Sequence, residues 1–298
     1  MINSWELQIL DRANERSPES GIDTYDTCWD KTWFSQYRHK ITYEFNSRGF
    51  RDAEWPENVD NVIWCVGDSF TSGVGVPYSH VWPQVLSRLG QRRTINISLD
   101  GASNNWMARQ INTIIDAYKP DTIVVHWSFI PRRESTLSDA LDQAWAQYYH
   151  KISERAWPTC KTIAEIKTLP SDIQQKLQVI LDDHTWWHNY DIESLRRLQY
   201  IKTGLDEDWQ NLQDCISLIS KQQSTKIIHS FIPDWHAGLN PKQNFNFHGH
   251  PSIEEIKQVD RGRDGFHYDI KTARLFCQQI IKILNSNDSS NTSDKKSD

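Results

Sequence analysis

The chain alternates short apolar runs rich in β-branched residues with segments of helical periodicity, and this alternation restricts the possible folds to a small set. The apolar runs have the continuous pattern of strands that are buried on both faces, as in a parallel sheet. Two segments between them, residues 79–90 and 104–120, carry apolar residues three or four positions apart, which indicates helices. Gly90 is expected to cap the first helix and Pro120 to stop the second. The apolar runs are residues 61–66, 94–98, 122–127 and 226–231.

A βαβαβ order of this kind implies right-handed crossovers and an open sheet with helices on both faces. We therefore predict an α/β fold: a three-layer α/β/α sandwich with a flavodoxin-like parallel sheet, plus a helical insertion. The last element, residues 268–284, has a strong amphipathic pattern and is expected to be a helix. Sites in such folds lie at the carboxyl ends of the strands, so polar residues there are the candidates for chemistry.

The predicted domain organisation follows from where this alternation holds. Residues 1–60 are expected to form an N-terminal extension packed on the core, and residues 61–285 the main domain. Within the main domain, residues from about 135 to 224 are polar, helix-patterned and without a convincing strand, which indicates a helical insertion. Residues 286–298 are polar and of low complexity, so we expect a disordered tail.

Net charge and the lengths of the apolar runs indicate which partners the chain is not expected to bind. The 298 residues carry a net charge of −6 without a long basic run, so we expect no nucleic-acid partner. No apolar run approaches the length of a membrane span and no leader pattern begins the chain, so we expect a cytoplasmic protein without membrane contact. The five cysteines lack metal-site spacing and are expected to be reduced and mostly buried. The 14 tryptophans fit either core packing or stacking on sugars.

The stretch VIWCVGDSFTSGVGVP, residues 62–77, places Ser69 directly after the first predicted strand. A hydroxyl at such a strand-to-helix turn projects above the sheet, where backbone N–H groups can stabilise an oxyanion. Serine is a weak nucleophile and needs a base, and the base needs a group to orient it. By itself the stretch fits a nucleophile and an ordinary polar turn about equally.

The segment RDGFHYD supplies a carboxylate and an imidazole three residues apart, Asp264 and His267, just before the last helix. At that spacing on a turn an aspartate can fix the tautomer of a histidine and stabilise its charged form. A capping aspartate beside a surface histidine would give the same pattern.

GDSF after a strand, a glycine after the second strand and D-G-x-H before the last helix together resemble the SGNH hydrolases, also called GDSL esterases or lipases. The flanking FNSRGFRD and TSGVGVP segments resemble those of bacterial members, and the resemblance covers residues 42–131 and 260–284. It implies that Ser69 is the nucleophile, His267 the general base and Asp264 its orienting acid. It also implies an oxyanion hole formed by the N–H groups of Ser69 and Gly101.

The segment after the third strand departs from the family pattern, which has an asparagine in a G-x-N-D motif as a further oxyanion donor. This chain has VVHWSFIPRRE, with Ile130 at the corresponding position. Loss of such a donor costs about 10²–10³ in rate. We name Asn104 as the substitute, ahead of Asn105, with a helix N-cap as the competing role.

Other polar residues carry weaker signals. Arg132 and Arg133 follow the third strand and are candidates to bind a substrate carboxylate or phosphate, or to form a solvated loop. His184 and His188 have metal-compatible spacing but lack the glutamate of H-E-x-x-H, and HGHP at 248–251 fits a flexible loop. We expect no metal and no organic cofactor. His126 is expected to be a strand residue.

The predicted function is a serine esterase that hydrolyses a short-chain acyl ester through an acyl-enzyme, with O-acetyl groups on carbohydrate among the candidates. The expected partner is a small-molecule or carbohydrate ester, and no oligomeric state is assigned. The altered third-strand segment keeps open a catalytically weak or inactive binding or structural module on the same fold. An O-acyltransferase is the other alternative, because a sugar alcohol can replace water as the acceptor.

Overall fold

A computed structural model describes residues 21–22, 37–100, 102–130, 171, 205–221, 224–232, 244–254 and 256–286. Its contacts divide the chain into two units, Met1–Phe129 with Leu212–Asp298, and Ile130–Asn211. The sheet and the helices that position the candidate site belong to the first unit. Most of the predicted insertion, and the predicted tail beyond Ser286, lie outside the described residues.

The core of the first unit is a parallel sheet with the strand order β4-β3-β5-β6. In chain order this is 2-1-3-4, which is the predicted flavodoxin-like order. The strand residues are buried except Lys226 at the start of β6, which explains the continuous apolar runs in the sequence. An isolated parallel bridge between His229 and Ser252 extends the pairing beyond β6. The strands are β3 (Ile63–Gly67), β4 (Thr94–Ser98), β5 (Thr122–Trp127) and β6 (Lys226–Phe231).

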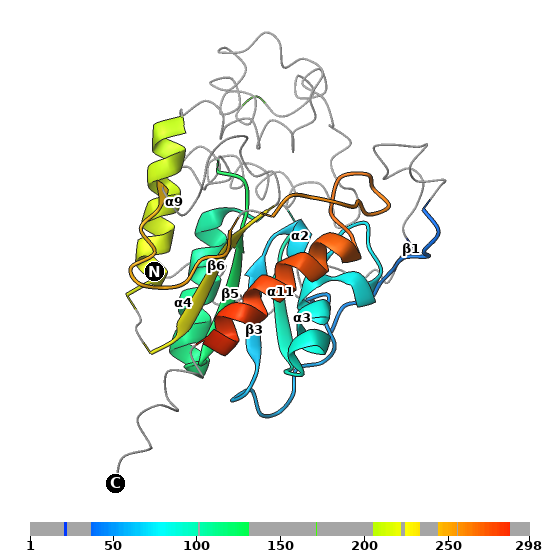
Figure 1. The fold of residues 1–298 in the computed structure, drawn as a ribbon, viewed down its shortest axis with the longest axis horizontal. Helices are drawn as coiled ribbons and strands as arrows, with labels where there is room; N and C mark the ends of the chain where they lie inside the picture. The colour runs from blue at the N-terminus through cyan, green and yellow to red at the C-terminus, as the bar shows by residue number, and fades with distance from the viewer. Residues whose placement is uncertain are drawn as a thin grey trace. The chain divides into compact units, whose positions relative to one another are not determined.

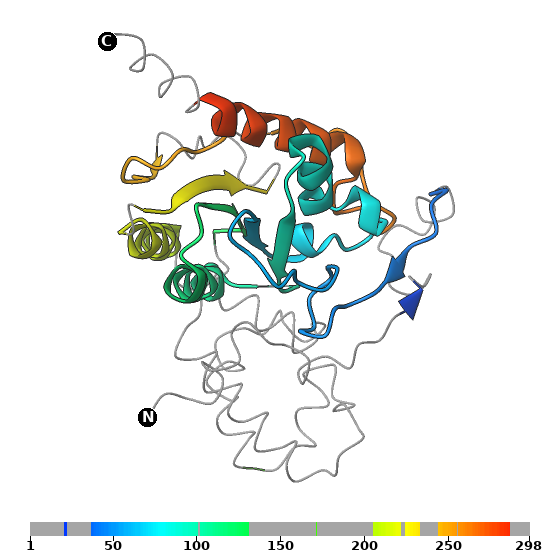
Figure 2. The same cartoon turned by 90° about the horizontal axis from the view of Figure 1, so that it is seen from below.

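Helices cover both faces of this sheet, which gives the predicted three layers (Figures 1 and 2). One layer contains α3 (Trp82–Gly90) and α11 (Ile270–Ser286), which pack against each other through Trp82 and Phe276. The other layer contains α4 (Asn104–Tyr118) and α9 (Leu205–Ile219), which lie on the opposite side of the sheet in Figure 2. From Leu212 onward α9 groups with the sheet, although this range was expected to belong to the insertion.

Two predicted helix ends test the capping signals. Pro120 was expected to stop the second helix, and α4 ends at Tyr118 with Lys119 in the left-handed conformation at φ 46°. The expectation for Gly90 was wrong, because Gly90 is the last residue of α3 and Gln91 takes the left-handed cap at φ 50°. The Gln91 N–H still bonds to the Ser87 carbonyl, so the hydrogen bond of the cap forms one residue later than predicted.

Two short helices lie between β3 and α3. Helix α2 (Ser69–Ser72) begins one residue after Asp68, and the 3-10 helix η3 (Tyr78–His80) precedes α3. On the N-terminal side, β1 (Gly21–Ile22) pairs antiparallel with β2 (Thr42–Tyr43).

Arg51, from the segment preceding β3, is only 2% exposed and donates to backbone carbonyls on both sides of it in sequence. It bonds to Ser72 O and Gly73 O at the end of α2, to Val76 O in the following loop and to Thr42 O in β2. The described part of the predicted N-terminal extension therefore contacts the segment that follows the candidate nucleophile.

Several aromatic and sulfur residues of the described ranges lie in the core. Trp64, Trp82 and Trp127 are fully buried, which favours core packing over sugar stacking for these indoles. Cys65, Cys215 and Cys277 are buried free thiols, as predicted, while Cys28 and Cys160 lie outside the described residues. Within the described ranges, every helix is too short or too polar to span a bilayer.

Candidate active site

Ser69 is the first residue of α2, and it lies at the carboxyl end of the central strand β3. Parallel pairing sets Gly67 beside Ser98 of β4 and beside His126 of β5, so the three strand ends meet at one rim of the sheet. Ser69 is 7% exposed. The turn from β3 into α2 is tight. A Cβ on Gly67 would overlap the Thr71 side chain, so only glycine fits at this strand end.

His267 and Asp264 come to this same rim from the loop before α11. His267 Nε2 lies 2.7 Å from Ser69 Oγ, although 198 residues separate the two in sequence. On the other side of the ring, His267 Nδ1 contacts Asp264 Oδ2. The structure thus brings together three of the residues that the sequence singled out.

The Asp264 carboxylate is held by more than the imidazole. Its Oδ1 accepts from the N–H groups of Phe266 at 3.0 Å and His267 at 3.1 Å. Burial acts to raise the pKa of Asp264, but the hydrogen bond and charge of His267, together with these N–H groups, leave it below its ordinary value. The ionised Asp264 accepts a hydrogen bond from Nδ1–H, which leaves Nε2 as the acceptor for the Ser69 hydroxyl.

A glycine of the loop after α2 lies directly beside this carboxylate. Gly75 has φ +75°, and its carbonyl accepts a hydrogen bond from Arg263 N at 2.6 Å. Its N–H donates to the Tyr43 hydroxyl at 2.9 Å. The loop is therefore tied to β2 on one side and to the Asp264 loop on the other.

Asp68 connects the start of α2 to the end of β5. It is fully buried, caps α2 by accepting from Phe70 N at 3.0 Å, and accepts from Ser128 Oγ at 2.5 Å through its other oxygen. Neither Asp68 nor Ser128 was singled out from the sequence. An aspartate at a strand-to-helix junction is a standard N-cap signal and could have been recognised, whereas the contact with Ser128 has no local signature.

Asn104, the predicted substitute oxyanion donor, is the first residue of α4 and is fully buried. Its Oδ1 accepts from Ser128 N at 3.0 Å, and its Nδ2 donates to Phe129 O at 3.1 Å. The competing role as N-cap is filled by Ser103, whose hydroxyl accepts from Trp106 N. Because an amide nitrogen carries two hydrogens, Asn104 keeps one N–H beyond the bond to Phe129.

The remaining predicted residues divide into those the structure describes and those it does not. Gly101, Arg132, Arg133, His184 and His188 lie outside the described residues. His126 is a buried residue of β5, as predicted, and burial lowers its pKa to about 3.

The HGHP segment forms a turn in which His248 and Gly249 have positive φ. His248 Nε2 contacts Ser217 Oγ at 3.0 Å and His250 Nδ1 accepts from Ile227 N at 3.2 Å, so both imidazoles have protein partners. Within the described ranges, no group of three or more His, Cys, Asp or Glu residues is arranged to hold a metal ion.

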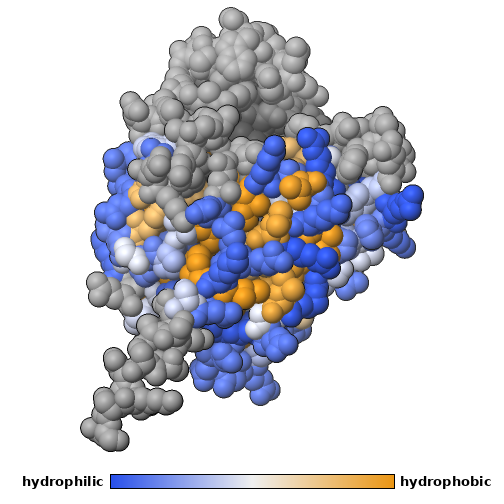
Figure 3. Space-filling model, in the orientation of Figure 1, coloured by the Kyte–Doolittle hydropathy of each residue, from blue (hydrophilic) through white to orange (hydrophobic). Residues whose placement is uncertain are grey.

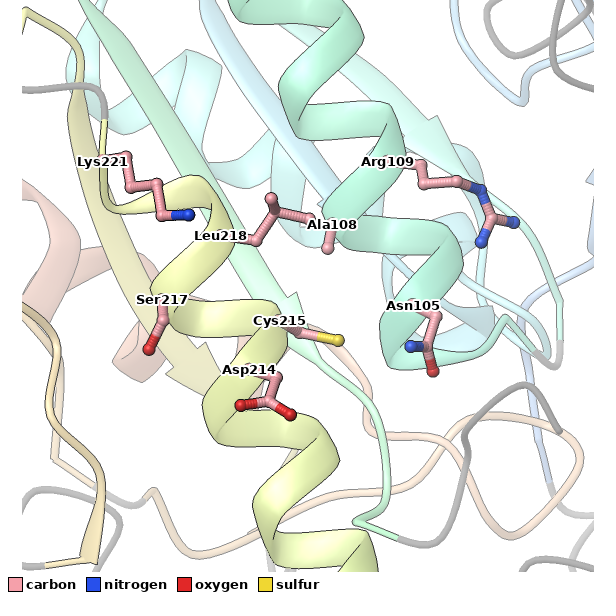
Figure 4. Close-up of a pocket in the computed structure, with 8 residues that line it drawn as sticks. All are labelled: Asn105, Ala108, Arg109, Asp214, Cys215, Ser217, Leu218 and Lys221. Carbon is pink, nitrogen blue, oxygen red and sulfur yellow. The ribbon is translucent and has the colours of Figure 1, made fainter. Parts of the chain in front are cut away.

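A groove of about 440 Å³ lies between α4 and α9. Leu218 extends from α9 toward Ala108 of α4, with polar side chains around them (Figure 4). Asn105, the second candidate for the oxyanion donor, lines this groove, whereas Ser69, Asp264 and His267 do not.

No family model matches the chain, and no curated protein matches it. Among solved structures, a lipolytic protein of the G-D-S-L family from Veillonella parvula is similar, with 15% identity and a TM-score of 0.38, over 75% of this chain and 97% of that one. A family two carbohydrate esterase from Clostridium thermocellum shows 12% identity and a TM-score of 0.40, over 78% of this chain and 66% of its own. The esterase EstA from Pseudoalteromonas shows 12% identity and a TM-score of 0.35, over 76% and 100%.

Proposed function

We propose that this chain is a serine ester hydrolase of the SGNH type. The observation that carries the proposal is the Ser69–His267–Asp264 arrangement, with Ser69 Oγ 2.7 Å from His267 Nε2 and Asp264 against Nδ1. Nucleophile, base and orienting acid have the hydrogen-bond order that acyl transfer through serine requires.

In the acylation step, Ser69 Oγ attacks the ester carbonyl carbon while its proton passes to His267 Nε2. Asp264 stabilises the imidazolium that forms and keeps Nδ1 protonated. The tetrahedral intermediate collapses with cleavage of the bond to the alcohol oxygen, and His267 Nε2 returns its proton to that oxygen. The alcohol leaves and the acyl group remains on Ser69.

In the second step, water attacks the acyl carbon as His267 Nε2 removes a proton from it. Collapse breaks the bond to Ser69 Oγ, which takes the proton back from His267, and the carboxylic acid is released. The two steps consume one water for each ester and require no metal or organic cofactor.

The proposed oxyanion donors are the N–H groups of Ser69 and Gly101 and the second N–H of Asn104. Among the hydrogen bonds of the described residues, none uses the Ser69 N–H, so it is available to an oxyanion. The role of Asn104 is supported by its burial and by its contacts with Ser128 and Phe129, which hold its amide at the end of β5. We assign short-chain acyl esters as substrates, with O-acetyl groups on carbohydrate as the first to test.

The decisive experiment compares the wild-type chain with Ser69→Ala in hydrolysis of 4-nitrophenyl acetate. Ser79→Ala is the matched control, because this exposed serine precedes α3 and lies outside the proposed machinery. The expected result is loss of about 10³-fold or more in kcat for Ser69→Ala alone. A phosphonate ester should label the wild type at Ser69 and leave Ser69→Ala unlabelled. Equal rates would support the inactive binding module instead.

Hydrolysis and acyl transfer are separated by adding a sugar alcohol to the same reaction. A hydrolase releases acetate in proportion to nitrophenol, whereas an acyltransferase releases less acetate than nitrophenol because part of the acyl group appears on the sugar.

A further inference from the structure

Phe266 lies between the two catalytic residues of the DGFH segment in sequence and is 47% exposed. Its N–H is tied to Asp264 Oδ1 at 3.0 Å, and its carbonyl accepts from Gln258 Nε2 at 3.0 Å. The preceding residue, Gly265, has φ +75°. These contacts fix the backbone of an aromatic residue that is about half exposed.

The ring of Phe266 belongs to an aromatic cluster assembled from three distant segments. Its centroid lies 5.7 Å from that of Phe70, the residue after the nucleophile, and 6.4 Å from that of Phe129, two residues beyond β5. Phe70 and Phe129 are 6.4 Å apart. Phe70 is 4% exposed, so it backs the cluster, and Phe266 presents more of its surface than Phe129, which is half-buried.

The position of Phe266 relative to His267 indicates which half of an ester it would meet. The two rings meet edge to face, with centroids 5.2 Å apart and an angle of 89°. In the proposed mechanism His267 Nε2 must reach the alcohol oxygen to protonate it, so the departing alcohol lies on the imidazole side of the site. The acyl group stays on Ser69.

We propose that Phe266 is a specificity residue that binds the alcohol half of the substrate, and that this alcohol carries a ring with a flat apolar face. Such a face is provided by an aryl alcohol and by the C–H side of a sugar ring, and both pack on an exposed phenyl group. The inference rests on the proposed function, and it adds the class of alcohol to the class of reaction.

Four other large apolar side chains of the described residues are exposed, and one of them, Leu218, lines the groove between α4 and α9. Leu89 of α3 and Leu275 of α11 are aliphatic and lie on outer helices, where hydrophobic and hydrophilic residues are interspersed (Figure 3). Val259 lies in the loop that precedes Asp264 and His267. Of these, Leu275→Ala is the matched control, since it removes a similarly exposed large side chain outside the proposed site.

The test keeps the acyl group constant and varies the alcohol, using ethyl acetate, phenyl acetate and an acetylated methyl glucoside. Phe266→Ala is expected to lower kcat/KM about three- to tenfold for the esters of ring alcohols and less than about twofold for ethyl acetate. Phe266→Trp, which keeps a flat ring, should restore the rate. The phenyl and sugar esters show separately which ring the site prefers.

A second series keeps phenol as the alcohol and lengthens the acyl group from acetate to hexanoate. The effect of Phe266→Ala should be the same along this series. An effect that grows with acyl length would assign Phe266 to the acyl side. An equal loss for every ester, ethyl acetate included, would show that Phe266 acts on His267 instead of on the substrate, and no loss would show that it does neither.

The Ser69→Ala variant separates failure of this inference from failure of the proposed function. If Ser69→Ala abolishes hydrolysis while Phe266→Ala behaves like Leu275→Ala, only the role of Phe266 is wrong. If Ser69→Ala keeps the wild-type rate, or the wild type cleaves none of these esters, the proposed function is wrong and the role of Phe266 falls with it.

Discussion

Gly75 lies so close to Asp264 that a Cβ on this glycine would come within 2.8 Å of the carboxyl carbon and of Oδ1. The loop that follows the proposed nucleophile therefore forms the surface against which the orienting acid rests. Its other contacts, with Tyr43 and Arg263, hold it in this position.

We expect Gly75→Ala to lower kcat by about 10- to 100-fold, because small displacements of catalytic groups are costly and the added methyl group displaces the Asp264 carboxylate. Gly249→Ala is the matched control. Gly249 also has positive φ, at +88°, but a Cβ added there would have no atom within 4 Å. Both variants should lose about 1–2 kcal/mol of stability from backbone strain. If the control loses as much activity as Gly75→Ala, strain and not the contact with Asp264 is responsible.

Asp264→Asn should lower kcat by about 10³–10⁴-fold while the fold is kept, because the amide favours the wrong tautomer of His267. Circular dichroism checks the fold, and steady-state hydrolysis of 4-nitrophenyl acetate gives the rate. A loss of less than tenfold would mean that Asp264 does not orient His267.

The ionised Asp264 should also stabilise the protein. Its pKa in the folded state is depressed, so this stabilisation is present above the ordinary carboxyl pKa of about 4 and is lost as the pH falls through the lower folded value. Urea unfolding at a series of pH values measures the free energy of unfolding of the wild type and of Asp264→Asn. The difference between these two free energies should shrink as the pH is lowered.

Two fully buried histidines predict a second pH dependence, at higher pH. Burial lowers the pKa of His126 to about 3, and burial with the charges of His250 and His248 lowers that of His229 to about 3. Because the unfolded chain binds these protons near its ordinary pKa of 6.5, stability falls as the pH drops from about 6.5 toward 3.

His229→Asn keeps an acceptor for Trp127 Nε1, which bonds to His229 Nδ1, and removes one of the two titrations. The free energies of unfolding of wild type and variant should then converge on acidification by about 1.4 kcal/mol per pH unit between about pH 6 and pH 4. Parallel curves would contradict a neutral buried His229.

Arg51→Met should reduce the free energy of unfolding by about 3 kcal/mol or more, because several buried carbonyls lose a charged donor. Arg48→Met is the control, since Arg48 contacts the Trp55 ring at 4.4 Å and is half-buried, which is worth about 1 kcal/mol at most. Denaturant unfolding measures both. Equal losses would mean that the carbonyl contacts of Arg51 contribute little.

Asn104→Ala should lower kcat by about 10²–10³-fold if its amide donates to the oxyanion. Asn105→Ala, one residue further along α4 and half-buried, tests the alternative that the sequence left open, and the exposed Ser79→Ala is the control. Because Asn104 also holds Ser128 and Phe129, the unfolding free energies of both variants must be measured alongside the rates. A rate for Asn104→Ala no lower than that of a remote surface change would remove it from the oxyanion hole.

Much of the local structure could be predicted because it depends on residues close together in sequence. The four strands follow from continuous apolar runs, and α3, α4 and α11 follow from helical periodicity. The cap at Gln91 could not be predicted, since the preference of glycine for the left-handed conformation does not fix which residue ends the helix. The predicted domain boundaries and the roles of Gly101, Arg132 and Arg133 remain predictions.

The sequence by itself determined the strands and helices of a parallel α/β sheet and placed Ser69, Asp264 and His267 next to the ends of these elements. Only the tertiary structure decided that Ser69 and His267 approach to 2.7 Å, because a contact across 198 residues depends on the packing of α11 against α3 and on sheet register. The same holds for Gly75 against Asp264 and for Phe266 beside His267. These contacts join loops whose relative positions are set by the core and by no local sequence signal.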